Sequence, residues 1–167
     1  AITDHGNMYG ALQLYGEGLK AGIKPIIGCE FYICNDRFNK QGKGDMAHIV
    51  LIAKNNEGYK NLLKLSGIAS KEGYYYKPRI DYKCLKEYSK GIICLSACLA
   101  GDIPQFLLNG QYEKAKKLAI ELSEMFEQTE GSKLTEGVRM KMPAIYYIDR
   151  RNKRQPKCIS NFFVNIF

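Results

Sequence analysis

The chain has 167 residues, of which 46% are hydrophobic and 25% are charged, as in one soluble globular domain with a buried core. This length leaves no room for a second full domain, and no apolar run reaches the roughly 18 to 20 residues of a membrane-spanning helix. The net charge is +8, but the stretch from Glu130 to Phe167 supplies +5 of it, with eight basic residues against three acids. The charge therefore gives only weak support to nucleic-acid binding by the part before that stretch.

Apolar, β-rich segments alternate with segments of helical periodicity. In chain order we expect a helix over residues 8–19, strands over 24–33 and 47–53, a helix over 55–68, a strand over 91–97 and a helix over 112–126. Continuous apolar strands are typical of a parallel sheet that is covered on both faces. The sequence therefore predicts an α/β fold, either an open doubly wound sheet or a barrel, and periodicity does not choose between them.

Two further features bear on the natural context of the chain. Residues 1–3 resemble the end of an apolar strand, so we expect the true N-terminus to lie upstream of Ala1. The six cysteines form no CxxC pair and lie mostly in apolar segments, where a free thiol behaves as a small hydrophobe. Because no signal-peptide pattern opens the chain either, we expect a cytoplasmic protein with reduced thiols. The cysteines are Cys29, Cys34, Cys84, Cys94, Cys98 and Cys158.

The character of the sequence changes after about Gln128. No clean periodicity survives there, and a basic run over residues 150–157 is followed by an apolar end over 162–167. One interpretation is a disordered basic extension. The other is out-of-frame translation of an AT-rich gene, which favours codons for Lys, Asn, Ile, Phe and Tyr. We therefore divide the chain into a domain over residues 1–127 and a basic tail over residues 128–167.

Three side chains that can carry chemistry follow or end predicted strands, and a fourth opens one. His5 and Cys98 come after strands, Glu30 lies inside an apolar strand, and His48 opens another. Functional groups of α/β folds collect at the C-terminal ends of strands. Singly, each has a structural explanation: His48 as a hydrogen-bonded core residue, Glu30 as the partner of a Lys or Arg, and Cys98 as packing. Together, imidazole, carboxylate and thiolate are ligands of zinc or similar divalent ions.

The segment Tyr74–Arg79 mixes aromatic and basic residues in the order YYYKPR. This combination can stack on bases and contact phosphates of single-stranded nucleic acid. A turn whose tyrosines pack on a neighbouring helix is the simpler interpretation.

Five blocks in fixed order carry a resemblance to a known family. They read AITDHGNMYGAL, AGIKPIIGCEFYI, HIVLIAKNNEGYKNLLKLS, GYYYKPRID and LSACLAGDIPQFLLNGQYEKA. They closely resemble the N-terminal PHP domain of bacterial DNA polymerase III alpha subunits, and the match covers residues 1 to about 126. The resemblance implies a distorted, TIM-like barrel of seven strands with a metal cluster at the C-terminal ends of the strands.

Carried over motif by motif, the resemblance implies four ligands of a divalent metal, with zinc or manganese expected in a complete site. These are His5 of TDHG, Glu30 of GCEF, His48 of HIVLIA and Cys98 of SACLAG. Asp4 is then a neighbour that could orient His5. The family also has an HxH motif on its first strand and a DxH motif near its end, and neither is present here. We therefore expect an incomplete barrel that lacks its first strand and its C-terminal part, with a partial metal site.

The functional expectation concerns a parent protein. The resemblance implies DNA-directed DNA polymerase activity in DNA replication, with primer–template DNA and other polymerase III holoenzyme subunits as partners. In some members this domain also hydrolyses 3' ends. The present chain holds none of the polymerase site, so we expect it to be inactive in nucleotidyl transfer. The alternatives are a stand-alone, metal-dependent phosphoesterase resembling histidinol phosphatase, and a non-catalytic interaction module.

Overall fold

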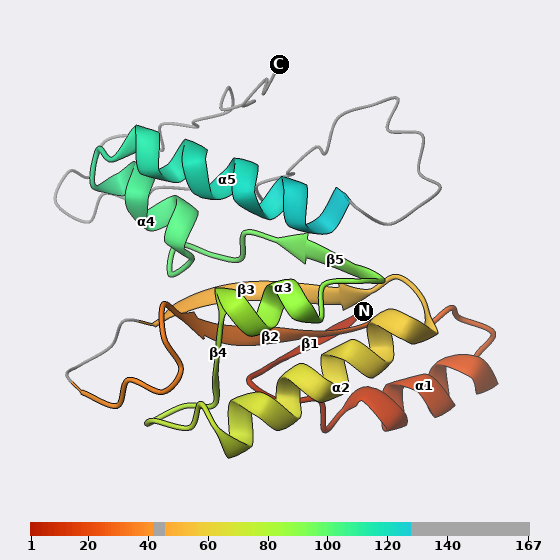
Figure 1. Cartoon of the computed structure of the whole chain (residues 1–167). Helices are drawn as coiled ribbons and strands as arrows, with labels where there is room; N and C mark the ends of the chain where they lie inside the picture. Colours follow the sequence, from red (N-terminus) through yellow and green to blue (C-terminus); the bar gives the residue numbers. More distant parts are fainter. Residues whose placement is uncertain (42–45, 128–167) are drawn as a thin grey trace, which may run out of the picture. The chain divides into compact units, whose positions relative to one another are not determined.

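The computed structural model describes residues 1–41 and 46–127, which belong to one compact unit, Ala1–Ser132. The predictions for residues 128–167 and for Cys158 lie outside the described residues. The described part of the chain is a mixed α/β fold (Figure 1). Its strands are β1 (Ile2–His5), β2 (Ile27–Cys34), β3 (Ala47–Ala53), β4 (Arg79–Asp81) and β5 (Ile92–Leu95). Its helices are α1 (Ala11–Lys20), α2 (Asn56–Lys71), α3 (Tyr82–Glu87), α4 (Asp102–Leu108) and α5 (Tyr112–Glu127).

The five strands form one sheet in the order β1-β2-β3-β5, and β4 also pairs with β2. β1 and β4 run parallel to β2, whereas β3 runs antiparallel to both β2 and β5. The expected α/β class is confirmed, but the expected all-parallel arrangement is wrong. The connection from β2 to β3 contains no helix among its described residues, and an antiparallel return needs no helical crossover.

β2 is the centre of the sheet and of the core. Most of its residues are buried, as expected for a strand with neighbours on both edges and cover on both faces. α2 packs against β2, β3, β4 and β5, and α5 packs against α4 and β5 (Figure 1). The largest fully buried side chains come mainly from these elements; they are Phe31, Ile33, Leu51, Leu62, Leu65, Ile80 and Leu85. The core therefore fixes β2 and β3, the strands that carry Glu30 and His48.

Local sequence signals explain where two helices begin. The side chain of Asn55 accepts a hydrogen bond from the Gly58 backbone N–H at 2.9 Å, and Asp81 caps α3 in the same way through Cys84. Gly58 is required by packing as well, because a Cβ atom there would lie 1.8 Å from the Gly91 carbonyl oxygen. These contacts hold α2 close to the chain that enters β5.

Most predicted elements are present with shifted ends. The strand expected over 24–33 is β2 at 27–34, the one over 47–53 is β3, and the helix over 8–19 is α1 at 11–20. The strand expected over 91–97 ends already at Leu95, since Ala97 adopts a left-handed conformation with φ of 60°. The short elements β4, α3 and α4 were not predicted.

Candidate functional site

The end of β1 lies beside the middle of β2, and this register brings two candidate ligands together. His5 is the parallel partner of Glu30, and its Nδ1 atom lies 2.7 Å from Oε1 of the Glu30 carboxylate. The Glu30 side chain is 13% exposed, whereas that of His5 is 73% exposed. A carboxylate that is largely withdrawn from water needs donors, and the His5 ring provides one from the solvent side when Nδ1 carries the proton.

β3 brings His48 to the same carboxylate. His48 lies opposite Tyr32, and Glu30 lies opposite Val50, so the two residues project from one face of the sheet. The His48 Nδ1 atom lies 3.2 Å from Glu30 Oε1. The His48 ring also meets the Tyr32 ring edge to face, with centroids 5.2 Å apart. The Glu30 carboxylate therefore lies between two imidazoles.

The fourth candidate, Cys98, lies in the loop after β5. Its Sγ atom lies 3.5 Å from Nδ1 of the His48 ring, and Cys98 is exposed. Two backbone hydrogen bonds fix the loop: His48 N–H to the Ala100 carbonyl at 3.0 Å, and Gly101 N–H to the Cys98 carbonyl at 2.9 Å. Gly101 leaves no room for a side chain, because a Cβ atom would lie 2.3 Å from the Ser96 carbonyl oxygen. The thiol is thus held beside the imidazole by the backbone.

Asp4 contributes through the backbone. Its Oδ2 atom accepts a hydrogen bond from the Gly10 N–H at 3.2 Å, at the start of α1. Adjacent residues on a strand point to opposite faces, so the Asp4 carboxylate and the His5 ring leave β1 in different directions. The contact closes the turn that follows His5, between β1 and α1, and a direct orienting contact from Asp4 to His5 stays a prediction.

Two residues that were not predicted to lie near the four candidate ligands border this cluster. Tyr32 packs on His48, and the Lys77 ammonium lies 5.7 Å from the centroid of the Tyr32 ring. The alternation of side chains along β2 could have indicated Tyr32, which stands two residues from Glu30 on the same face. No signal in the sequence placed Lys77 there, because its position depends on the pairing of β4 with β2.

The core cysteines differ from Cys98 in their exposure to solvent. None of the five described cysteines forms a disulfide, and Cys29, Cys34 and Cys84 are buried. Burial raises the pKa of Cys29 to about 12, and the negative charge of Asp4 adds to the effect. Burial likewise raises the pKa of Cys84 to about 12. The thiols of Cys29 and Cys84 therefore stay protonated at neutral pH. Cys98, in contrast, is exposed and lies beside His48.

The donor set fits a divalent metal in its chemistry. Two imidazole nitrogens, one carboxylate and one thiol are the groups that bind zinc, and nitrogen and oxygen donors also suit manganese. In the structure these donors contact one another, His5 and His48 through Glu30 and Cys98 through His48. Among the described residues, no group of three or more His, Cys, Asp or Glu side chains is spaced to hold an ion. The role of His5, Glu30, His48 and Cys98 as metal ligands therefore stays a prediction.

Comparison with known proteins identifies the family. The model of the PHP domain matches residues 1–132. The chain belongs to the PHP domain family. Relatives of this PHP domain include the DNA polymerase III subunit alpha of Borreliella burgdorferi, 49% identical over 130 residues that cover 75% of the chain and 11% of that protein. The subunit alpha of Helicobacter pylori is 48% identical over 138 residues, which cover 76% of the chain and 11% of that protein.

The subunit alpha of Chlamydia muridarum is 49% identical over 122 residues, which cover 71% of the PHP chain and 10% of that relative. The resemblance expected from the five sequence blocks is therefore confirmed, and the chain spans about a tenth of the length of these curated relatives. PHP domains are a metal-dependent family in general. Among the described residues of the chain, no helix has the length and apolarity needed to cross a membrane.

Proposed function

We propose that the chain is part of the PHP domain of a replicative DNA polymerase III alpha subunit. The parent protein catalyses DNA-directed nucleotide addition in DNA replication, in the cytoplasm, with primer–template DNA and other subunits of the polymerase III holoenzyme as partners. The proposal is supported by the match of residues 1–132 to the PHP domain and by relatives at 46–50% identity that bear this name. The palm and fingers of the polymerase lie outside the present chain.

The chain contributes a partial divalent-metal site built from His5, Glu30, His48 and Cys98. The observation that carries this proposal is the position of the Glu30 carboxylate between two imidazoles, 2.7 Å from one and 3.2 Å from the other. A bound zinc or manganese ion would supply Lewis-acid chemistry toward a phosphoester. Glu30 supplies the negative charge that attracts the cation, and the backbone of the Cys98 loop holds the thiol beside His48.

The fold is an incomplete form of the seven-stranded, TIM-like PHP barrel. Within the described residues β1 pairs with β2 alone, and α1 leaves Leu12, Tyr15 and Leu19 exposed along one stripe. An edge strand next to an uncovered apolar helix face suits a further strand and helix of the same barrel. The barrel proper occupies residues 1–127, and residues 128–167 form the basic tail.

Titration calorimetry with Mn²⁺ tests the site. We expect weak binding to the wild-type chain, and loss of that binding in Glu30→Gln, which keeps the shape but removes the charge. Glu17→Gln is the matched control, since Glu17 is exposed and pairs with Lys20 on α1. Equal binding by the wild type and Glu30→Gln would contradict the proposed site.

Two further experiments test the parent. The genomic locus should be sequenced beyond both ends and translated in all reading frames. We expect an HxH motif upstream, and downstream a DxH motif followed by polymerase domains. A primer-extension assay with the purified chain should show no nucleotide incorporation. A locus without these motifs would favour a stand-alone phosphoesterase or an interaction module.

A further inference from the structure

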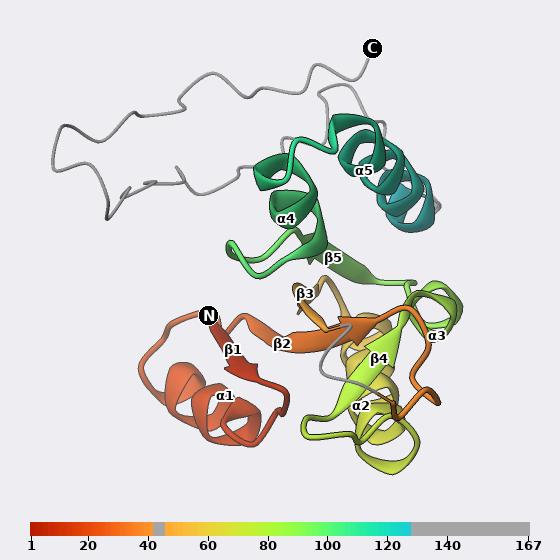
Figure 2. The same ribbon diagram turned by 90° about the vertical axis from the view of Figure 1, so that its left-hand side faces the viewer.

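Two segments that are distant in sequence meet at one point on the edge of β2. β1 pairs with residues 27–30 of that edge, and β4 pairs with residues 32–34 of the same edge. The end of β1 at His5 and the start of β4 at Arg79 therefore lie next to each other along this edge of β2. A Cβ atom on Gly6 would lie 2.9 Å from the Tyr32 ring and 3.1 Å from Pro78. Figure 2 shows the loop between α2 and β4 close to the end of β1.

The turn before β4 has an aromatic residue at its tip in an unfavourable conformation. The Tyr75 backbone N–H donates to the Lys77 carbonyl at 3.0 Å, which places Tyr76 at the tip. Tyr76 has a φ of 59°, in the left-handed region that costs energy for every residue except glycine. Its side chain is 72% exposed, so little burial compensates for this cost. Strain of this kind is typical of functional positions.

The next residue places a cation beside the candidate metal cluster. Lys77 is exposed, and its Nζ atom lies 5.7 Å from the centroid of the Tyr32 ring. That ring in turn contacts His48. The Lys77 ammonium is thus connected to the His5–Glu30–His48 cluster through the Tyr32 ring, and Tyr76 is its neighbour in the chain.

The base of the turn is rigid because Arg79 anchors it. Arg79 is 4% exposed, and its guanidinium donates to the carbonyls of Gly73, Arg37 and Asn39 at 3.0 to 3.2 Å. The same guanidinium lies over the Tyr75 ring, 5.1 Å from its centroid. These contacts hold the backbone at the base of the turn that carries Tyr76 and Lys77, which lowers the entropic cost of binding there.

We propose that the turn Tyr74–Lys77 binds a single-stranded nucleic acid at the edge of the metal cluster. The Tyr76 ring stacks on a base, and the Lys77 ammonium contacts a backbone phosphate. The inference deepens the proposed function and rests on it, because a phosphodiester of this strand is the group that the cluster would face.

Fluorescence anisotropy with labelled single-stranded DNA of about ten nucleotides tests the subsite. The measurement uses the full chain in EDTA, so that the result is independent of metal. We expect Tyr76→Gly to lower the affinity roughly tenfold and Tyr76→Phe to retain it, because stacking needs the ring and not the hydroxyl. Lys77→Gln should lower the affinity and reduce the slope of log K against log salt by about 0.7.

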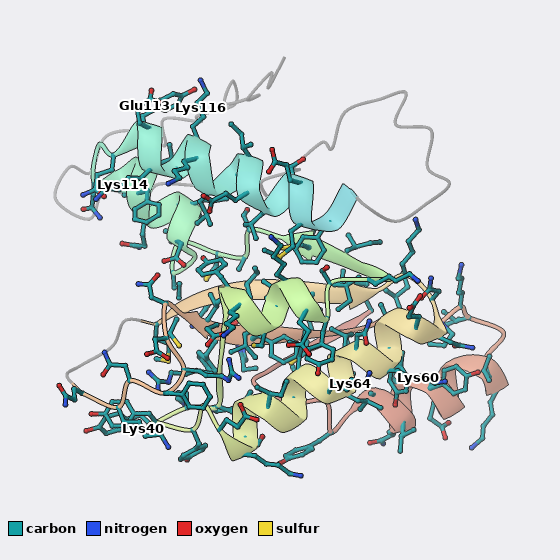
Figure 3. All side chains as sticks on the ribbon, viewed as in Figure 1. Lys40, Lys60, Lys64, Glu113, Lys114 and Lys116 are labelled. Atoms are coloured by element: carbon teal, nitrogen blue, oxygen red, sulfur yellow. The ribbon has the colours of Figure 1, made fainter. Side chains whose placement is uncertain are left out.

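Two matched controls separate this subsite from diffuse binding. Lys60→Gln removes an exposed cation from α2 (Figure 3), and Tyr112→Ala removes a half-exposed ring at the start of α5. Both should bind DNA like the wild type. The proposal is overturned if Lys60→Gln weakens binding as much as Lys77→Gln does, or if Tyr76→Gly binds like the wild type.

The same data distinguish failure of the subsite from failure of the metal cluster. Mn²⁺ binding without DNA binding would overturn the subsite and leave the metal cluster standing. DNA binding that depends on Tyr76 and Lys77, without Mn²⁺ binding, would support the subsite and contradict the metal cluster.

Discussion

The two strands that share one edge of β2 are supported in different ways. Around β4, Arg79 and Asp81 are each 4% exposed, and their charges are paired with hydrogen-bond partners. Around β1, every strand residue keeps some exposure, and α1 buries only Ala11 and Gly18. The β4 side is thus held by a closed polar network, whereas on the β1 side α1 leaves Leu12, Tyr15 and Leu19 exposed. The candidate site lies where the two strands meet.

Arg37 is the centre of that polar network. Its guanidinium contacts both carboxylate oxygens of Asp81, at 3.0 and 2.8 Å, and also Glu72 at 2.8 Å. Asp81 in addition caps α3. Among the described side chains, no buried nitrogen or oxygen lacks a hydrogen-bond partner. A network in which all members are satisfied fixes one geometry, and here it fixes the loop after β2.

The largest effect is expected from Arg79→Met. This change leaves the carbonyl groups of Gly73, Arg37 and Asn39 without their donor, and we expect the free energy of unfolding to fall by about 3 kcal/mol. Urea denaturation measures the loss. Lys83→Met, at an exposed position on α3, should stay within about 0.5 kcal/mol of the wild type. If Arg79→Met and Lys83→Met lower the free energy of unfolding equally, the Arg79 hydrogen bonds do not contribute the expected stabilisation.

Asp81→Asn should have an intermediate, pH-dependent effect. Burial of the Asp81 carboxyl opposes its ionisation, but hydrogen bonds from the Cys84 backbone and from Arg37 outweigh burial and lower its pKa below the ordinary value. The stabilisation is thus present above the unfolded pKa of about 3.9 and is lost as the pH falls through the folded pKa. Asparagine still caps α3, so at pH 7 we expect a loss of about 2 kcal/mol from the lost charge.

Urea unfolding of the wild type and Asp81→Asn at pH 7 and near pH 2 checks this linkage. The difference between the two proteins should shrink at the lower pH, because Asp81 then approaches its neutral form. A difference that stays constant with pH would contradict the assigned role of the Arg37–Asp81 pair.

The smallest effect is expected on the β1 side. Leu12 is 76% exposed on α1, so Leu12→Ala should change the free energy of unfolding by no more than about 0.5 kcal/mol. Leu62→Ala on α2 is the matched control: Leu62 is 0% exposed, and its truncation should cost about 3 kcal/mol. A large loss from Leu12→Ala would show that this stripe is already covered, and would remove one support for the incomplete barrel.

The sequence predicted the long elements better than their pairing. The apolar runs around Phe31 and Leu51 are continuous enough to mark β2 and β3, but their antiparallel pairing depends on the loop between them. β4 has three residues, which is too short for a periodic signal, and its place beside β2 depends on a tertiary network. This is why the partners of Arg79 could not be predicted from composition or spacing.

The sequence indicated four candidate residues but not the contacts among them. His5, Glu30, His48 and Cys98 were expected from their place near strand ends and from the family resemblance, and the structure brings them into a chain of contacts. Spacing could not predict that His5 and His48 share one carboxylate oxygen, because this follows from two strand registers at once. The role of the four residues as metal ligands stays a prediction.

The central claim is that Glu30 and the two histidines bind a divalent ion. Crystals of the chain soaked in Mn²⁺ and measured at the manganese absorption edge test it most directly. We expect an anomalous peak about 2.2 Å from the Glu30 carboxylate and from a nitrogen of His48, with His5 or Cys98 turned toward it. A soaked crystal with no peak there, and with Glu30 still hydrogen-bonded to both imidazoles, would contradict the claim.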